Sequence, residues 1–158
     1  MIGEPTLVMN AAEIQRILPH RYPFLLIDRV TEFVPAQRIA GVKTFSAGEA
    51  YSHGHFPGVG AVPCAILLEM TTQLGAILVL EQPEMQNKIA MILQIPSARM
   101  HALAFAGDTV RGVAEVIRLR ENFGELEGKI YRDNELIAEG RVRFAIAPAS
   151  AAASGRAL

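Results

Sequence analysis

The sequence predicts an α+β fold in which an antiparallel β-sheet wraps around one long central helix. Two observations indicate this fold. A continuous apolar segment at residues 62–80 is long enough to form a helix that crosses a small domain. After Pro83 the chain changes to strand-like segments joined by short connections, which is typical of antiparallel strands. Because no repeat and no linker interrupts this pattern, residues 1–158 are predicted to form a single domain.

The central helix is predicted to run from Pro63 to Leu80. Pro63 suits a first helical turn because its φ is fixed and its missing N–H would have no helical partner. Apolar residues fall on every side of the segment, so it must be covered by protein or lie in a membrane. Glu69 near its middle and the absence of a flanking basic cluster argue against the membrane. We therefore expect a buried helix whose internal carboxyl needs a partner.

Upstream of the central helix, the sequence predicts one short helix and two strands. Asn10 and Glu13 have the spacing of a capping box at the start of the short helix. Residues 18–29, LPHRYPFLLIDR, indicate a structured turn followed by a strand from Phe24 to Val30. A second strand is predicted at residues 38–45, after a proline-containing turn.

Four strands are predicted after the central helix, at residues 88–100, 109–120, 125–131 and 135–144. The first is nearly continuous in apolar residues, as a strand covered on both faces would be. The last two alternate between apolar and charged residues, which is typical of strands with one exposed face. Short connections among the four indicate an antiparallel meander. The alanine-rich residues 147–158 are expected to be a disordered tail.

The composition argues against several classes of function. A net charge of −1 and a charged fraction of 20% provide no basic surface for nucleic acid. The single cysteine, Cys64, excludes an internal disulfide and a cysteine-based zinc cluster. The first residues lack the basic and apolar regions of a secretory signal, so the cytoplasm is the expected location.

Three titratable residues lie in or beside the central segment: His53, His55 and Glu69. His55 occurs in a loop rich in glycine and proline that leads to the helix N-terminus, where free N–H groups stabilise a developing oxyanion. Glu69 lies inside the apolar helix, and burial raises the pKa of a carboxyl, which suits a general acid. Together these groups predict proton abstraction next to a carbonyl.

Each of these residues also has a structural interpretation. A loop histidine is more often packed or solvated than catalytic. The carboxyl of Glu69 is explained equally well by a hydrogen bond to a neighbour or by an interface. Cys64 is expected to be a small buried hydrophobe, although a helix N-terminus lowers the pKa of a thiol. His53 and His55 alone make a weak metal pair, so no metal site is predicted.

Several motifs occur together in one order along the chain. They are LPHRYPFLLIDR at residues 18–29, GHFPG at residues 54–58, and Glu69 followed four residues later by Gln73. In this combination the sequence resembles the (3R)-hydroxyacyl-[acyl-carrier-protein] dehydratases of bacterial type II fatty acid synthesis. The resemblance covers residues 14–146. Glutamate rather than aspartate at position 69 is similar to the general branch of the family, not to the branch that also isomerises its product.

The resemblance implies a fold, an activity and an assembly. The fold is the hotdog fold, in which a curved antiparallel sheet wraps a central helix. The activity is that of a hydro-lyase that converts a 3-hydroxyacyl thioester to a trans-2-enoyl thioester, with the substrate delivered by acyl carrier protein. No cofactor is expected, because the thioester itself makes the C2 proton acidic. The implied assembly is a homodimer with active sites at the subunit interface, often as a trimer of dimers.

The family motifs also imply roles for individual residues. His55 of one subunit would remove the C2 proton, and Glu69 of the other subunit would assist departure of the C3 hydroxyl as water. The backbone N–H of Cys64 would polarise the thioester carbonyl. The substrate pocket implied by the same motifs consists of Tyr22, Phe24, Phe56, Pro57, Gly58 and Gln73.

The sequence departs from the family pattern at several positions. Gly60 replaces a proline, and Cys64 replaces the glycine that donates its N–H to the thioester. Thr71 and Thr72 occur where alanine-like residues are usual, and residues 100–108 lack the usual arginines and prolines. These departures favour a divergent member with a specialised acyl chain or pathway. Two alternatives stay open: a non-catalytic acyl-binding partner subunit, and a thioesterase or coenzyme A ester dehydratase of the same fold.

Overall fold

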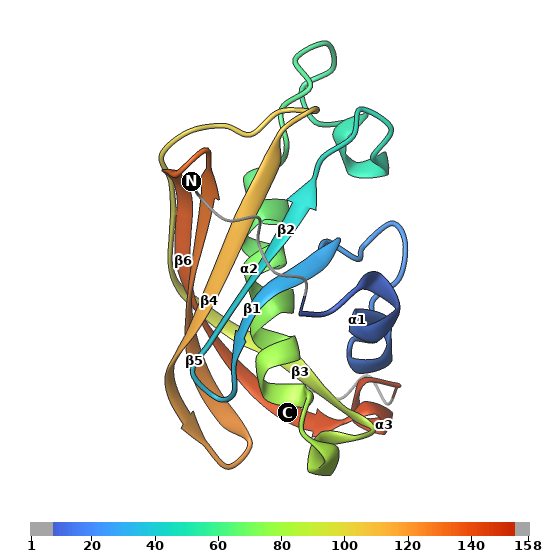
Figure 1. Ribbon diagram of the computed structural model, residues 1–158, viewed down its shortest axis with the longest axis vertical. Helices are drawn as coiled ribbons and strands as arrows, with labels where there is room; N and C mark the ends of the chain where they lie inside the picture. The colour runs from blue at the N-terminus through green and yellow to red at the C-terminus, as the bar shows by residue number, and fades with distance from the viewer. Residues whose placement is uncertain (1–7, 154–158) are drawn as a thin grey trace.

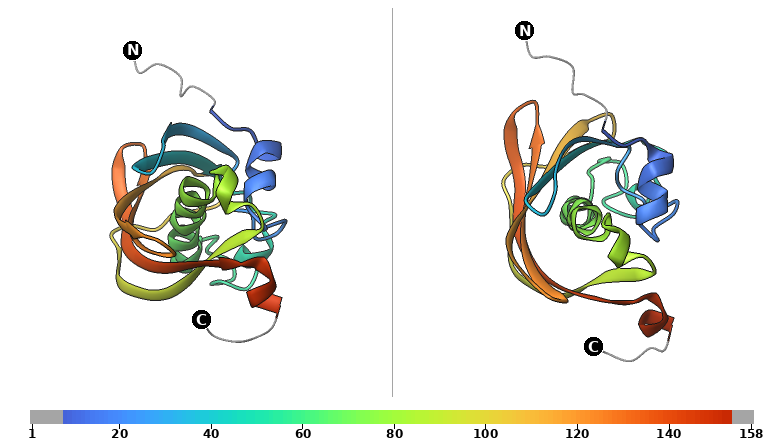
Figure 2. Two further views of the ribbon diagram at one scale, coloured as in Figure 1. Left: turned by 90° about the horizontal axis from the view of Figure 1, so that it is seen from below. Right: turned by 60° about the horizontal axis from the view of Figure 1, so that its bottom comes forward.

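One curved antiparallel sheet surrounds a single long helix in the computed structural model, which describes residues 8–153 (Figure 1). The helix, α2 (Cys64–Leu80), lies on the concave side of the sheet, and the end-on views in Figure 2 show the strands bending around it. The predicted α+β architecture is therefore confirmed. Among the described residues, no helix is long and apolar enough to cross a membrane.

The short N-terminal helix, α1 (Ala11–Ile17), forms as its capping residues predict. The side chain of Asn10 accepts hydrogen bonds from the backbone N–H groups of Ala12 and Glu13, and the Glu13 carboxylate accepts from the N–H of Asn10. The capping box is confirmed, and it satisfies N–H groups that a helix start leaves without partners. Helix α1 lies on the side of α2 that the sheet leaves open (Figure 2).

The strands are β1 (Arg29–Val34), β2 (Arg38–Thr44), β3 (Lys88–Met100), β4 (Thr109–Arg120), β5 (Phe123–Arg132) and β6 (Glu135–Pro148). Their order across the sheet is β1-β2-β4-β5-β6-β3. Strands β4, β5 and β6 form the predicted meander. The prediction is wrong for β3, which pairs with β6 at the sheet edge and not with β4. The connection of residues 101–108 carries the chain back across β6 and β5, so a short connection does not join neighbouring strands here.

Strand β1 begins later than predicted, so the expected strand from Phe24 to Val30 is wrong for residues 24–28. Helix α2 supplies the reason. The side-chain oxygen of Gln73 accepts a hydrogen bond from the N–H of Leu26 at 2.9 Å, and its amide nitrogen donates to the carbonyl of Phe24 at 2.7 Å. A helix side chain thus partners the backbone groups that a neighbouring strand would have paired.

Strand β3 has the predicted bounds but not the predicted burial. Residues 92–99 are exposed, and the exposed fractions of Ile92, Leu93 and Ile95 are 42%, 50% and 46%. The expectation of a strand covered on both faces is therefore wrong for a single chain. The strand pairs on one side only, because it forms an edge of the sheet. A long apolar edge of this kind is a typical site of pairing with another chain.

The predicted start of the disordered tail, residue 147, is too early in the chain. Ala147 is buried and pairs with Ile89 of β3, and the N–H of Ala149 donates to the carbonyl of Asn87 at 2.8 Å. Residues Ala149–Ala153 then form the short helix α3. The prediction is wrong for residues 147–153, because the β3–β6 ladder extends to the end of β6 and a run of alanines favours a helix. Residues 154–158 lie outside the described part of the chain.

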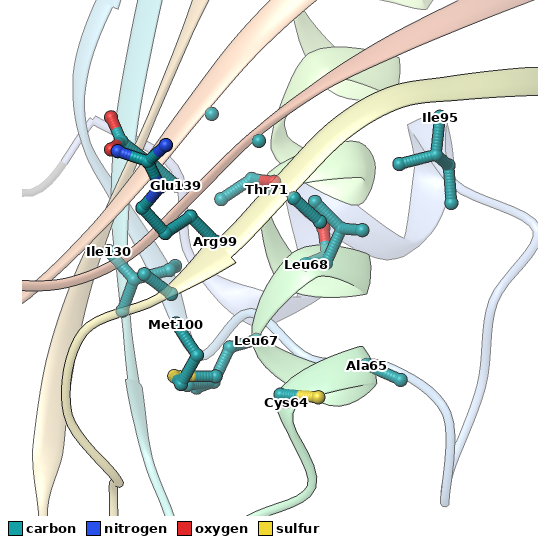
Figure 3. Close-up of a pocket in the computed structure, with 14 residues that line it drawn as sticks. Cys64, Ala65, Leu67, Leu68, Thr71, Ile95, Arg99, Met100, Ile130 and Glu139 are labelled. Atoms are coloured by element: carbon teal, nitrogen blue, oxygen red, sulfur yellow. Dashed lines mark hydrogen bonds between the residues drawn. The ribbon is translucent and has the colours of Figure 1, made fainter.

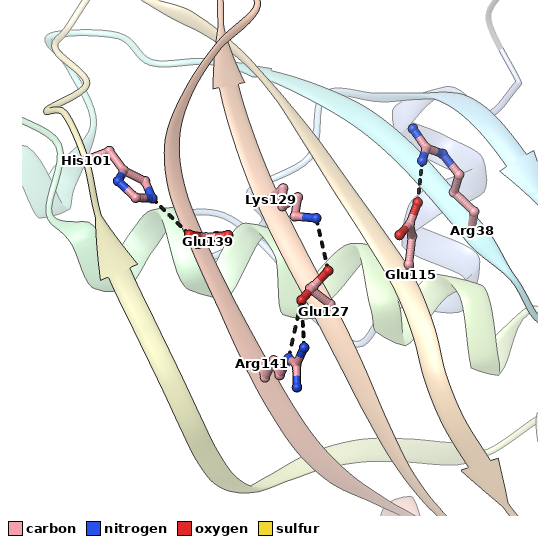
Figure 4. Close-up of polar contacts among 7 residues, drawn as sticks. All are labelled: Arg38, His101, Glu115, Glu127, Lys129, Glu139 and Arg141. Atoms are coloured by element: carbon pink, nitrogen blue, oxygen red, sulfur yellow. Dashed lines mark hydrogen bonds and ion pairs between the residues drawn. The ribbon is translucent and has the colours of Figure 1, made fainter.

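The two faces of the sheet differ in polarity, as the alternation of apolar and charged residues along the last two strands predicts. Buried apolar side chains from the concave face pack on α2, and Leu126 and Ile130 of β5 are examples. The convex face carries charged side chains, shown in Figure 4. There Glu127 accepts from Lys129 at 3.0 Å and from Arg141 at 3.3 Å, and His101 lies 3.0 Å from the Glu139 carboxylate. Such exposed pairs contribute little stability individually.

Candidate active site

His55 lies in a tight loop between the turn Ala50–Ser52 (η1) and α2. Its Nδ1 is 3.0 Å from the carbonyl oxygen of Ala61. A carbonyl only accepts, so the proton of the neutral ring is on Nδ1, and Nε2 carries the free lone pair. The ring also packs against Phe56, with 4.2 Å between centroids. The loop therefore holds His55 in the tautomer that a general base requires.

The chain reverses direction in this loop through residues with positive φ. Phe56, Gly58 and Gly60 have φ values of 49°, 85° and 71°. Glycine adopts such values without a Cβ penalty, and this geometry explains why glycines follow the histidine so closely. The reversal brings the chain directly to the N-terminus of α2.

Helix α2 begins at Cys64, one residue later than predicted, with Pro63 as its N-cap. Within residues 8–153 the N–H of Cys64 has no acceptor, as expected for the first turn of a helix. The expectation that Cys64 would be a buried hydrophobe is wrong, because the rest of the chain covers only one side of this first turn: Ile66 and Leu67 are buried, whereas Cys64 is exposed. A free N–H at the positive end of the helix can stabilise an oxyanion.

Glu69 lies in the first half of α2, with its side chain 17% exposed. One carboxylate oxygen, Oε1, accepts a hydrogen bond from Nε2 of Gln73 at 3.0 Å. Burial raises the pKa of Glu69, and the hydrogen bond from Gln73 opposes that shift in part. The carboxyl consequently holds its proton more tightly than an exposed glutamate and is suited to act as a general acid.

Gln73 positions Glu69 rather than lining an open pocket. It is buried, and its amide group contacts Glu69, Phe24 and Leu26 at the same time. The side chain therefore joins α2 to the segment that precedes β1. Because its hydrogen bonds go to fixed backbone groups, Gln73 restrains one oxygen of the carboxyl.

His20 is a neighbour of Glu69 that the sequence reasoning missed. Its Nε2 lies 3.8 Å from Oε1 of Glu69. Burial, together with the adjacent positive charge of Arg21, lowers the pKa of His20 and favours the neutral ring. The Arg21 guanidinium donates to the carbonyls of Leu18, His20 and Gln15, which fixes this turn. The only available signal was the position of His20 inside the LPHRYPF motif.

The two principal candidates, His55 and Glu69, are not in contact within one chain. Among the hydrogen bonds and ion pairs of the described residues, those of His55 go to Ala61, and those of Glu69 go to Gln73 and His20. The loop is at the N-terminal end of α2 (Figure 1). Glu69 instead lies beside His20, in the connection between α1 and β1, and beside Gln73, which bonds to Phe24 of the same connection.

A cavity of about 360 Å³ lies between α2 and strands β3, β5 and β6 (Figure 3). Helix α2 contributes Cys64, Leu68 and Thr71 to its wall. Most of the remaining lining is apolar, with Arg99 and Glu139 as the charged residues among those that form it. Sequence reasoning missed this cavity, because its wall is assembled from one helix and three strands that are distant in the chain.

The six residues expected to form a substrate pocket are not brought together in one chain. Pro57 and Gly58 line a separate hollow of about 460 Å³, together with His53. Tyr22 and Phe56 are exposed, with fractions of 80% and 60%. The two others, Phe24 and Gln73, lie beside Glu69. In one chain these residues belong to two separate loops and a helix, so a pocket that they form together across a subunit interface stays a prediction.

Within residues 8–153, no three histidine, cysteine, aspartate or glutamate side chains are placed so that they could hold a metal ion.

Comparisons with known proteins agree in one family. The sequence profile of the FabA-like domain matches residues 18–141. A 3-hydroxyacyl-[acyl-carrier-protein] dehydratase FabZ from Desulforamulus reducens is 41% identical over 139 residues, which are 88% of this chain and 98% of that protein. The FabZ protein from Thermomicrobium roseum is 37% identical over 149 residues, covering 94% and 100% of the two chains.

Solved structures are similar in fold at lower sequence identity. The dehydratase heterocomplex ApeI:P from Xenorhabdus doucetiae has a TM-score of 0.76 at 18% identity, covering 89% of this chain and 95% of the other. A hot-dog-like protein from Thermanaerovibrio acidaminovorans has a TM-score of 0.63 at 18% identity, covering 78% and 90%. These likenesses show the hotdog fold, as expected from the sequence motifs.

Proposed function

The chain belongs to the FabA-like family of 3-hydroxyacyl-[acyl-carrier-protein] dehydratases, and from this premise we propose that it converts a (3R)-3-hydroxyacyl thioester of acyl carrier protein to the trans-2-enoyl thioester. The reaction serves fatty acid or related lipid biosynthesis in the cytoplasm. The observation that carries the proposal is the state of the two candidate groups. His55 has its free lone pair on Nε2, and Glu69 has a raised pKa caused by burial.

The residues of the site account for each atom of the reaction. Nε2 of His55 takes the C2 proton, and the C–H electrons move toward the thioester carbonyl, whose oxygen gains negative charge. The N–H of Cys64 stabilises this oxygen. The electrons return to form the C2=C3 bond as the C3–O bond breaks, and Glu69 donates its proton to the departing hydroxyl, which leaves as water.

The active unit that we propose is a homodimer in which His55 of one subunit meets Glu69 of the other. Two observations support this arrangement. His55 and Glu69 share no contact within the described part of one chain. The apolar edge of β3 at Ile92, Leu93 and Ile95 is exposed and can pair with a second copy. Association of three such dimers into a hexamer is a further part of the proposal.

Complementation between two inactive variants tests the shared site. We expect His55→Ala and Glu69→Gln homodimers each to lose about 10²–10⁴-fold in kcat/KM, because each lacks one proton-transfer group. A heterodimer of the two variants, purified with two different affinity tags, contains one intact site if the subunits share it. Activity in this heterodimer supports the proposal. An inactive heterodimer, with both variants folded, would show that each site lies within a single chain.

The exposed cysteine at the helix N-terminus favours one rival function, a partner subunit that binds acyl groups without turning them over. Loss of one water from 3-hydroxyacyl carrier protein, followed by mass spectrometry over several chain lengths, separates the two functions. Turnover by the wild-type protein alone supports the dehydratase. Turnover by Cys64→Gly but not by wild type would mean that the cysteine side chain blocks an otherwise competent site. No turnover by either protein would favour the partner subunit. Release of the free carrier thiol would instead indicate a thioesterase. A coenzyme A thioester of the same 3-hydroxyacyl group tests the remaining alternative, a dehydratase of coenzyme A esters.

A further inference from the structure

We propose that Thr71 determines how long an acyl tail the cavity between α2 and the sheet can hold. This inference rests on the proposed function, because it concerns the substrate of the same site. It assigns to Thr71 a role in specificity, whereas His55, Glu69 and the N–H of Cys64 act on the reacting atoms.

The position of the cavity relates it to the reacting end of the substrate. Cys64, whose N–H is proposed to bind the thioester carbonyl, is one of the residues that line it. From there the wall continues along α2 through Leu68 to Thr71 (Figure 3). A substrate whose carbonyl is held at the first turn of α2 can therefore place its hydrocarbon tail along the helix.

The chemistry of the wall matches a hydrocarbon chain. Leu67, Leu68, Met100 and Ile130 provide apolar surface, and burial of a hydrocarbon against such surface is favourable. Thr71 offers no free donor to a polar ligand, because its hydroxyl donates to the carbonyl of Leu68 at 2.7 Å. We infer that an alkyl tail, and not a polar group, occupies the inner part of the cavity.

The cavity ends where α2 packs directly on the strand backbone. Gly128 and Gly140 are neighbours in the β5–β6 ladder. A Cβ on Gly128 would lie 2.4 Å from the hydroxyl oxygen of Thr71, and a Cβ on Gly140 would lie 2.8 Å from Leu68. Thr71 thus occupies the space above Gly128 and leaves no gap between the helix and the strand.

Beyond Thr71 the interior is nearly solid. The next hollow along α2 is lined by Thr72 and Gly75 from the helix and by Leu126 from the sheet, and its volume is about 10 Å³. A Cβ on Gly75 would lie only 2.1 Å from Leu126, which shows how closely these residues pack. A space of that size holds at most one water molecule, so a tail cannot continue past Thr71.

Substitutions at Thr71 separate its volume from its hydroxyl. Kinetics with 3-hydroxyacyl carrier proteins of increasing chain length give a ratio of kcat/KM for long over short substrates. We expect Thr71→Ala to raise this ratio by about tenfold, since it removes the group that ends the cavity. Thr71→Val keeps the shape and should leave the ratio unchanged, whereas Thr71→Leu should lower it.

Thr72→Ala is the matched control, because Thr72 also donates its hydroxyl to the carbonyl of Leu68, at 3.1 Å, but lines the smaller hollow. We expect it to leave the ratio unchanged. An unchanged ratio in a folded Thr71→Ala protein that still turns over short substrates would overturn the inference. A changed ratio of kcat/KM for Thr72→Ala, with an unchanged ratio for Thr71→Ala, would also overturn the inference.

A binding measurement distinguishes failure of this inference from failure of the proposed function. Titration with saturated acyl carrier proteins of the same chain lengths reports on the tail alone and requires no turnover. If the wild-type protein dehydrates nothing but Thr71→Ala shifts the preferred length in binding, the proposed function fails and the cavity assignment stands. If dehydration occurs but Thr71→Ala changes the length preference in neither assay, only the cavity assignment fails.

Discussion

The two halves of α2 differ in how completely the rest of the chain covers them. Every residue from Gln73 to Leu80 is buried. In the first half, by contrast, several residues are half-buried or exposed, and these are Cys64, Ala65, Leu68, Glu69 and Thr72. The first half also carries the free N–H, the carboxyl with a raised pKa and the cavity wall. One helix thus contains a segment that is completely buried and a segment that is left partly accessible.

The difference has a cause in packing. In the second half, Leu74 is completely buried, and a Cβ on Gly41 or Gly112 would lie within 2.9 Å of its side chain. Small residues on the strands therefore let the helix approach closely at this level, as in the densely packed interiors of other proteins. In the first half, Leu68 makes a similar contact with Gly140 but also borders the cavity.

Truncation of one leucine in each half gives the largest expected effect on stability. Leu74→Ala should lower the free energy of unfolding by about 2–5 kcal/mol, because it leaves a void in a region that cannot collapse. Leu68→Ala should cost clearly less, since Leu68 already borders open space. Urea denaturation of both variants measures the difference. Equal losses would mean that the two halves contribute equally to stability.

Removal of the Gln73 amide tests the boundary between the halves. Gln73→Leu leaves the N–H of Leu26 and the carbonyl of Phe24 without their partner, which should cost about 1–3 kcal/mol. The substitution also removes the hydrogen bond that Gln73 donates to the Glu69 carboxylate, so kcat should fall as well. The control is Gln86→Leu, an exposed position expected to change stability by no more than about 0.5 kcal/mol. A loss of stability with unchanged kcat would show that Gln73 does not position the carboxyl.

The pH dependence of stability gives the smallest expected effect. Burial raises the pKa of Glu69 in the folded protein, so the folded state binds this proton more tightly than the unfolded state. The resulting stabilisation is fully present below the unfolded pKa and is lost as pH rises through the folded pKa. Glu69→Gln should therefore be more stable than wild type at neutral pH and closer to it in acid. Denaturation curves at several pH values test this, and a variant less stable at neutral pH would contradict it.

Much of the fold follows from local patterns in the sequence. The capping box of Asn10 and Glu13 and the bounds of β4 agree with prediction, because caps and turns depend on neighbouring residues. The start of β1 does not agree, because Gln73, distant in the chain, partners the backbone there. The exposure of β3 could not be predicted either. Its apolar run predicts a covered strand, but does not tell whether the same chain or a second copy would cover it.

The sequence by itself determined the central helix, the α+β class and the two candidate residues, His55 and Glu69, that we propose carry the chemistry. These depend on composition, periodicity and motif spacing, which are properties of short segments. Only the tertiary structure decided that Nε2 is the free nitrogen of His55, that His20 and Gln73 surround Glu69, and that a cavity runs from Cys64 to Thr71. The physical reason is that hydrogen-bond partners, burial and empty space depend on contacts between segments that are distant in the chain, and local sequence patterns do not predict those contacts.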